Sequence, residues 1–163
     1  MHRSVKKYSK QSTSKYLRLW AFGFTAYLIL AINMSSEDDW LSRFPDNQAR
    51  IFGLIFIASL LLTIGTTAYI ALKLRAELTN SDLSSEQRLV GSFAIASFVG
   101  TVIALFLPIF GAGALVLGIV ALRRTSTFSS HDLQEVLAYR SLSLYAVIAS
   151  SVFFMATVIL KSN

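Results

Sequence analysis

Four long stretches of the chain contain no acidic or basic side chain, and this feature constrains the fold more than any other. They cover Leu19–Ser36, Ile51–Leu72, Leu89–Leu122 and Ser141–Leu160, which are 18, 22, 34 and 20 residues long. An apolar helix of about 18 residues or more can cross a hydrocarbon core of roughly 30 Å. The sequence therefore predicts an all-α, polytopic integral membrane protein.

Composition supports a single folded unit. The 163 residues are 54% hydrophobic and only 15% charged, which is more apolar than a soluble domain of this size requires. The short charged segments between the apolar runs leave too little loop for a second domain. We expect one helical bundle at residues 19–160, preceded by a basic tail at residues 1–18.

The net charge of +6 is concentrated at the N-terminus. Six of the fifteen basic residues precede the first apolar run without any acidic residue: Arg3, Lys6, Lys7, Lys10, Lys15 and Arg18. Such a segment is typical of a cytoplasmic tail that contacts anionic lipid headgroups. We interpret it in this way rather than as a nucleic-acid-binding tail, and we expect the protein in a cell membrane, the bacterial cytoplasmic membrane.

The 34-residue run permits two architectures. As one helix it would extend roughly 51 Å, well beyond a bilayer core. Pro108 lies near its middle, and proline disfavours helix in the residue before it. Gly111 and Gly113 offer backbone freedom for a tight reversal. The run is thus either one long kinked helix or a hairpin of two helices.

Counting basic residues favours the hairpin. With five membrane spans and a cytoplasmic N-terminus, 12 basic residues lie inside and 3 outside; with four spans the numbers are 10 and 5. Both obey the positive-inside rule, but five spans obey it better. The expected spans lie near residues 17–34, 51–73, 89–107, 109–122 and 141–160. The fourth is short, so it spans a thinned membrane or ends part-way across.

One segment resembles a known family. Residues 93–124, FAIASFVGTVIALFLPIFGAGALVLGIVALRR, resemble an uncharacterised bacterial family of alanine- and glycine-rich membrane hairpins. In that family a small-residue helix turns at a proline, and the second helix ends in a G-x-x-A-L-R-R type sequence. The resemblance implies a hairpin and a bacterial origin, and it implies no activity.

Small residues mark the faces on which helices are expected to pack. Close approach of backbones provides much of the attraction between helices in a bilayer. We predict packing contacts at Ala96, Gly100 and Ala104 in the third span, and at Ala114 and Gly118 in the fourth. Ser59, Thr63, Thr66 and Thr67 add a weakly polar strip to the second span. These faces form either the internal seams of a monomer or contacts with a second copy or another membrane protein.

Aromatic residues suggest two further roles. Tyr16, Trp20 and Tyr27 suit anchors at the membrane interface. In the acidic segment between the first two spans, Trp40, Leu41 and Phe44 would share one side of a short helix. That helix would lie in the outer interface or would serve as an external docking surface for a partner.

Residues suited to catalysis or metal binding are almost absent. The chain has no cysteine, and its two histidines, His2 and His131, lie outside the apolar runs. Ser130-His131-Asp132 contains the residue types of a hydrolase triad, but neighbours on one helical turn point apart. No acidic group lies at membrane depth, as ion-coupled transport would require. We therefore expect no enzyme activity, no cofactor and no metal.

These observations favour a non-enzymatic membrane protein that acts by binding other membrane components. It would be an accessory or assembly subunit of a complex, or an immunity-type protein that intercepts a membrane-active toxin. The alternative is a passive channel or small transporter formed by an oligomer, and a lipid-modifying enzyme ranks third.

Overall fold

The structure is a computed structural model that describes residues 2–35, 44–80, 83–128 and 130–162. These residues form five helices and no strand. The helices are α1 (His2–Ser35), α2 (Asp46–Asn80), α3 (Ser85–Ile103), α4 (Ile109–Thr125) and α5 (Ser130–Ser162). The prediction of an all-α helical bundle is confirmed.

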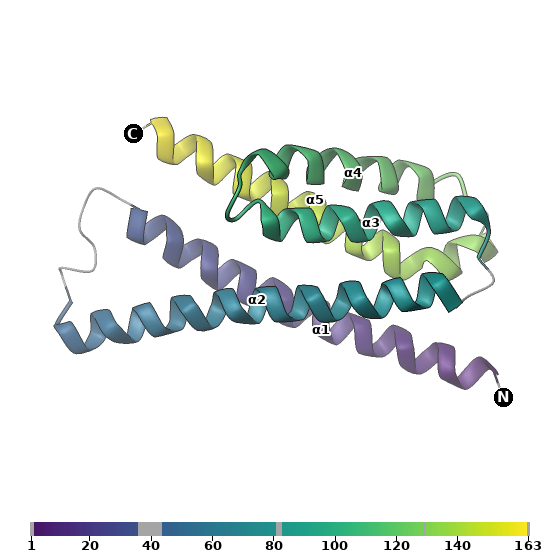
Figure 1. Cartoon of the computed structure of the whole chain (residues 1–163), viewed down its shortest axis with the longest axis horizontal. Coiled ribbons are helices and arrows are strands. Elements are labelled where there is room, and N and C mark those ends of the chain that lie inside the picture. Colours follow the sequence, from purple (N-terminus) through teal and green to yellow (C-terminus); the bar gives the residue numbers. More distant parts are fainter. Residues whose placement is uncertain (1, 36–43, 81–82, 129, 163) are drawn as a thin grey trace.

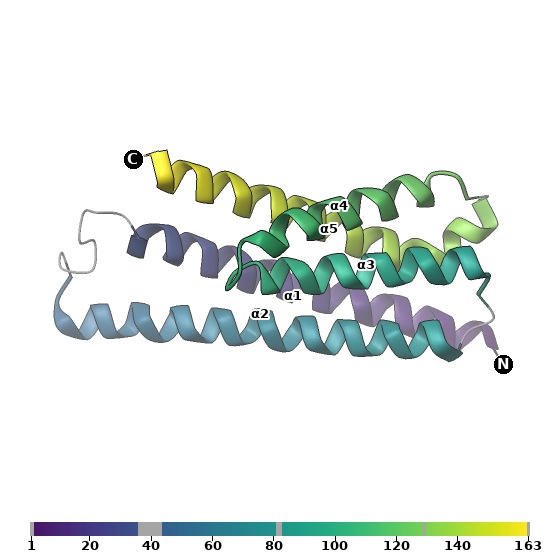
Figure 2. The ribbon, with the colours of Figure 1, turned by 45° about the horizontal axis from the view of Figure 1, so that its top comes forward.

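Successive helices run antiparallel along one long axis (Figures 1 and 2). The beginnings of α1, α3 and α5 and the ends of α2 and α4 lie at one end of the molecule. The ends of α1 and α5 and the beginning of α2 lie towards the other end. As a result α1, α3 and α5 run in one direction, and α2 and α4 run in the opposite direction.

The two ends of the bundle differ in charge. Eight described basic residues lie in the half of the bundle that contains the N-terminus: Lys15, Arg18, Lys73, Arg75, Arg88, Arg123, Arg124 and Arg140. We call it the basic end. At the opposite end of the described helices, α2 carries Asp46 and Arg50. The charge asymmetry on which the topology prediction depends is therefore also an asymmetry of the folded molecule.

A capping box begins α3. The Ser84 side chain accepts a hydrogen bond from the backbone N–H of Gln87 at 3.2 Å, and the Gln87 side chain accepts one from the Ser84 N–H at 2.9 Å. Both bonds satisfy backbone donors that the first helical turn would otherwise leave free. This short polar signal fixes where the chain re-enters the bundle.

The chain reverses between α3 and α4, so residues 89–122 form two helices rather than one kinked helix. The α-helix ends at Ile103, four residues before the predicted end at Leu107, and the backbone N–H groups of Leu105 and Phe106 bond to carbonyls only three residues back. Pro108 then caps α4. No glycine in the described chain has a positive φ. Gly111 therefore contributes close packing, against Ala104, and not the backbone freedom that we expected.

The α3–α4 hairpin is shorter than the other helices (Figure 1). A Cβ built on Gly111 would lie 3.4 Å from the Ala104 Cβ and 3.9 Å from a ring carbon of Phe153. The tip of the hairpin is therefore level with Phe153. From there α5 continues nine residues to Ser162, or about 13 Å at the rise of an α-helix.

Beyond the hairpin tip the described helices enclose no core. None of the described side chains of residues 31–34 of α1, 46–58 of α2 or 154–158 of α5 is buried. We call these three segments the open end. They are strongly apolar, and exposed residues include Leu54, Ile55, Phe154 and Met155.

Three segments of the described chain are long and apolar enough to cross a membrane: Ser14–Met34, Asp46–Asn80 and Val136–Val158. The helices α3 and α4, with 19 and 17 residues, are not among them. The long helices extend beyond the predicted spans, because α1 continues back to His2 and α5 begins at Ser130. The lead-in to the last span is thus part of the same helix.

Candidate functional site

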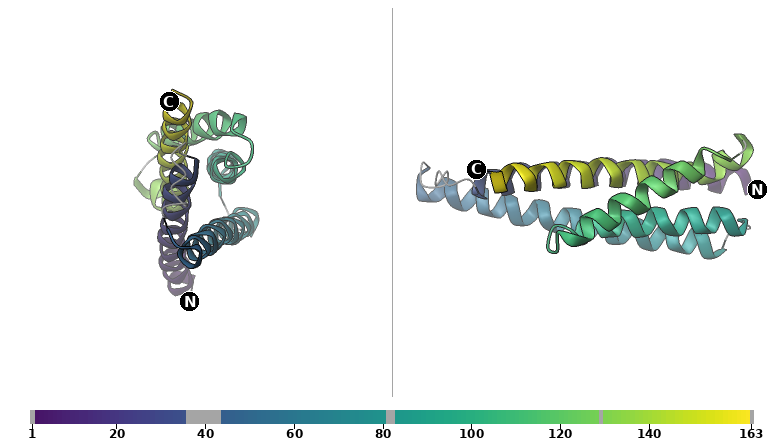
Figure 3. Two further views of the ribbon diagram at one scale, coloured as in Figure 1. Left: turned by 90° about the vertical axis from the view of Figure 1, so that its left-hand side faces the viewer. Right: turned by 90° about the horizontal axis from the view of Figure 1, so that it is seen from above.

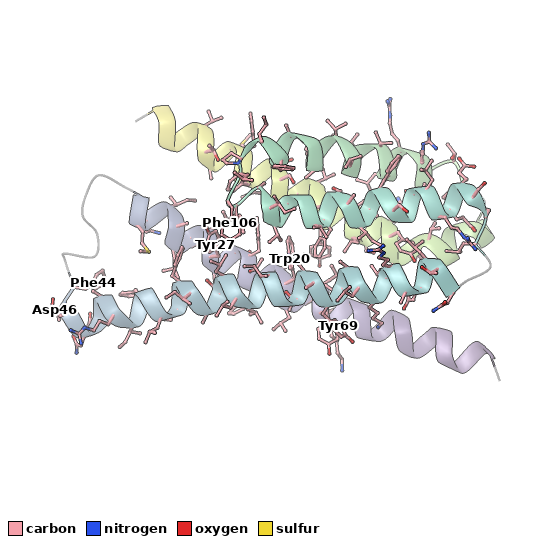
Figure 4. All side chains as sticks on the ribbon, in the orientation of Figure 1. Trp20, Tyr27, Phe44, Asp46, Tyr69 and Phe106 are labelled. Carbon is pink, nitrogen blue, oxygen red and sulfur yellow. The ribbon has the colours of Figure 1, made fainter. Side chains whose placement is uncertain are left out.

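The centre of the bundle is built around Trp20 of α1 (Figure 4). Its side chain is 1% exposed, and its ring packs against Phe24, Phe98 and Tyr145 at centroid distances of 5.0, 4.6 and 6.4 Å. The indole N–H donates to the Thr67 hydroxyl of α2 at 2.8 Å. One side chain therefore joins α1 to α2, α3 and α5.

Trp20 lies in the interior of the bundle and not on its outer surface, where an interfacial anchor was expected. A tryptophan near the end of an apolar run suits a membrane interface, but its N–H can also be satisfied in a core by a suitably placed acceptor. The polar strip of α2 supplies that acceptor, since all four of its predicted members are buried. Thr67 in turn donates to the Thr63 carbonyl at 2.7 Å. Tyr16 and Tyr27 are half-buried and pack against Tyr69 and Phe56 of α2.

A second cluster joins α3, α4 and α5, and we call it the three-helix seam. A Cβ built on Gly118 would lie 2.6 Å from Val147 Cγ2 and 2.7 Å from Ser97 Oγ. A Cβ on Gly100 would lie 3.1 Å from the Ala114 Cβ. No larger residue fits at Gly118 without movement of its neighbours, so this glycine sets how closely α4 approaches α3 and α5.

Hydroxyl groups link the same three helices. Ser97 Oγ donates to the Ala114 carbonyl at 2.6 Å, and Thr101 Oγ1 lies 2.9 Å from Ser150 Oγ. All these side chains are buried. Every buried side-chain nitrogen and oxygen in the described chain has a hydrogen-bond partner. The interior is therefore weakly polar and fully satisfied, as a low-dielectric environment requires.

The predicted packing residues are placed unequally. Ala104, Ala114 and Gly118 are buried, and Gly100 is half-buried against Ala114, whereas Ala96 is exposed. Each step of four residues turns about 40° around a helix of 3.6 residues per turn. A line through Ala96, Gly100 and Ala104 therefore turns around α3, so that Ala104 faces the seam and Ala96 does not. Ser97 and Thr101 take the place that we assigned to Ala96.

Sequence reasoning missed two close contacts. A Cβ on Gly91 would lie 2.5 Å from the Leu78 side chain, and one on Gly23 would lie 3.0 Å from Thr63 Oγ1. These glycines allow α2 to approach α3 and α1. Gly23 lies in no repeated small-residue pattern, whereas Gly91 begins a series with Ala94, Ser97 and Thr101 on the buried face of α3, a signal that was present in the sequence.

Of the three residues predicted to form an external docking surface, the structure describes only Phe44. Trp40 and Leu41 lie outside the described residues. Phe44 is half-buried, and its ring lies 5.1 Å from that of Phe52 on α2 in an edge-on arrangement. Part of its apolar surface is therefore used within the chain.

The described residues contain no group of three or more His, Cys, Asp or Glu side chains that could hold a metal. The side chains of His2, His131 and Asp132 lie outside the part of the chain that is described in atomic detail, so the structure does not place them. The described interior offers packing surfaces and hydroxyls.

Comparisons of the chain with protein-family models, with curated proteins and with solved structures found no match. The resemblance of residues 93–124 to a family of bacterial membrane hairpins therefore remains a prediction.

Proposed function

We propose that the chain is a non-enzymatic integral membrane protein that acts by binding another membrane protein through its open end. The observation that supports the proposal most strongly is the open end itself. Three apolar helices project past the tip of the hairpin with no buried side chain among their described residues. In a bilayer such surface is covered by lipid or by the helices of a partner.

We also propose that the basic end lies at the cytoplasmic surface of the membrane. The N-terminus is then cytoplasmic and the C-terminus is external. The supporting observation is the cluster of basic residues at that end, which the positive-inside rule assigns to the cytoplasm. The helices α1, α2 and α5 then cross the membrane in alternating directions. The α3–α4 hairpin inserts from the cytoplasm and ends before the outer surface.

This placement suits the exposed residues of the hairpin tip. Phe106, Leu107 and Ile109 are exposed, and Ile109 is 82% exposed. Phe106 lies beside the middle of the bundle and not at either end of it (Figure 4). Apolar side chains in such a position are favourable when hydrocarbon surrounds them.

The hydroxyl groups support partner binding over a pore formed by an oligomer. The strip of α2 faces Trp20 and the carbonyls of its own helix, so it is not available to line a channel between copies. Threonine and serine hydroxyls on the seam are likewise used between helices of one chain.

Orientation is tested by labelling single cysteines in intact cells with a membrane-impermeant reagent. We expect Ser42→Cys and Ser162→Cys to be labelled, and Ser12→Cys and Ser126→Cys to be protected. Labelling of Ser126→Cys from outside would refute insertion of the hairpin from the cytoplasm.

Partner binding is tested with a photo-crosslinking amino acid at Leu54, which is 67% exposed in the open end. The matched control is Val116, which is 59% exposed on α4 of the hairpin. We expect a protein adduct of defined mass from position 54 and none from position 116. If position 54 yields only lipid adducts while purified protein conducts ions in vesicles, the channel alternative replaces this proposal.

A further inference from the structure

A groove separates α1 from α5 at the basic end. It has a volume of about 340 Å³. On α1 its walls are Ser14, Leu17 and Arg18, and on α5 they are Leu137, Ala138, Ser141 and Tyr145. The two helices run in the same direction at this point (Figure 3), and the Tyr145 ring meets Trp20 edge-on at the inner end.

The groove lies at the level where both helices begin their charge-free runs. Arg18 directly precedes the run that starts at Leu19, and Ser141 is the first residue of the last run. Arg140 and Lys15 are exposed close to these positions. In the proposed placement this level is the cytoplasmic headgroup region of the bilayer.

Three polar side chains of the groove, those of Arg18, Ser14 and Tyr145, are hydrogen-bond donors with spare capacity, whereas the Ser141 hydroxyl already donates to the Leu137 carbonyl at 3.0 Å. Within the described chain Arg18 is exposed and makes no ion pair, and none of the described acidic residues lines the groove. Within the described chain the hydroxyls of Ser14 and Tyr145 donate to no other group. A guanidinium with two hydroxyls matches the oxygen atoms of a phosphate group.

An apolar track leads from the groove towards the membrane interior. Leu144 and Ile148 follow Leu137 and Ser141 on the same face of α5, and they are 49% and 54% exposed. On α1, Phe22 follows Arg18 by one turn and is 71% exposed. Phosphate-binding groups at the interface therefore continue into apolar surface that an acyl chain can cover.

From these observations we infer that the α1–α5 groove is a binding site for one anionic phospholipid. Arg18, Ser14 and Tyr145 hold its phosphate, and its acyl chains lie along Leu144 and Ile148. A soluble phosphate compound would gain the polar contacts but not the apolar track, so it would bind far more weakly. The inference rests on the proposed membrane placement but not on the partner at the open end.

Native mass spectrometry of the purified full chain in mild detergent tests the site. Phosphatidylglycerol and phosphatidylcholine are added separately, and glycerol 3-phosphate is added as a soluble competitor. We expect retention of one phosphatidylglycerol, weak retention of phosphatidylcholine and no competition by glycerol 3-phosphate. The Arg18→Gln variant should bind phosphatidylglycerol on the order of tenfold more weakly, because a charge-assisted hydrogen bond is lost.

Two further variants distinguish binding in the groove from non-specific attraction of acidic lipid to the basic residues. Arg124→Gln removes the same charge from the basic end at an exposed position on α4 that does not line the groove, and it should retain the lipid. Ala138→Phe fills the groove without a change of charge and should lose it. Equal loss in Arg18→Gln and Arg124→Gln, or unchanged binding in Arg18→Gln, would overturn the site. A chain that stays soluble without detergent would instead refute the membrane placement.

Discussion

The two ends of this bundle are built from similar apolar helices, yet they are packed differently. At the basic end and in the middle, α3, α4 and α5 meet through glycine, alanine, serine and threonine, and Trp20 brings in α1 and α2. At the open end α1, α2 and α5 continue without the hairpin, and none of their described side chains is buried. The two ends differ in the size and polarity of the side chains at the helix contacts, and not in the hydrophobicity of the helices.

The comparison teaches how a bundle of apolar helices acquires a closely packed part and a part without a core. Within a bilayer large apolar side chains gain little by leaving lipid, so isoleucine and leucine alone do not force helices together. Small residues allow backbones to approach, and buried hydroxyls then find partners on neighbouring helices. The packed half has both features, whereas the open end presents mainly large side chains.

The largest effect is expected from removal of Trp20. Trp20→Ala leaves a cavity at the meeting point of four helices and removes the donor to Thr67. We expect the free energy of unfolding to fall by about 3 kcal/mol, which is at the lower end of the values for such truncations. The value is low because detergent also shields the apolar groups of the unfolded chain. Equilibrium unfolding in detergent measures it. The control is Phe154→Ala at the open end, where the side chain is 62% exposed; an equal loss there would remove the distinction between the two halves.

The second effect concerns glycine. Gly118→Leu would overlap with Val147 and Ser97, which lie on two different helices. Overpacking of this kind should lower the free energy of unfolding by about 1–3 kcal/mol. Gly53→Leu makes the same change at the open end, where a built Cβ meets nothing within 4 Å. Thermal unfolding of both variants measures the contrast, and unchanged stability of Gly118→Leu would show that the seam is not closely packed.

A smaller effect is expected at the hydroxyl pair. Thr101→Val keeps the shape of the side chain but removes the contact with Ser150 at 2.9 Å. A loss of roughly 0.6 kcal/mol follows from typical values for hydrogen bonds between membrane helices. Thr157→Val at the open end removes only a bond to the Phe153 carbonyl of its own helix and should be close to silent. Similar losses in the free energy of unfolding of the two variants would mean that the bond between helices stabilises the fold no more than a bond within one helix.

The smallest effect is expected from replacement of the two histidines and the neighbouring Asp132, the residues considered as candidates for catalysis. Changing His2, His131 and Asp132 together to alanine should preserve any phenotype that a deletion of the gene reveals, at normal protein abundance. The reason is that no argument from the sequence assigns these residues a role beyond the start of a helix. A lost phenotype with normal abundance would move the function to the basic end and would favour an enzyme.

Part of this protein follows from the sequence by itself. The length of the charge-free runs determines that the chain is helical, Pro108 determines that the third run is broken, and Ser84 with Gln87 determines where α3 begins. The distribution of basic residues also makes one half of the bundle more positive than the other. Each of these signals acts within a few residues or along a single helix, so it does not depend on which helices become neighbours.

Tertiary structure decided the remaining features. From the sequence Trp20 is expected at the surface of the bundle, but in the fold it lies beside Thr67 in the interior. Ala96 is expected to pack against another helix, but the rotation of α3 places Ser97 and Thr101 in the seam instead. The open end depends on the level at which the hairpin tip meets Phe153. The physical reason is the same in each case. An apolar helix has favourable surface on every side within a membrane, so only contact with its neighbours selects which side is buried.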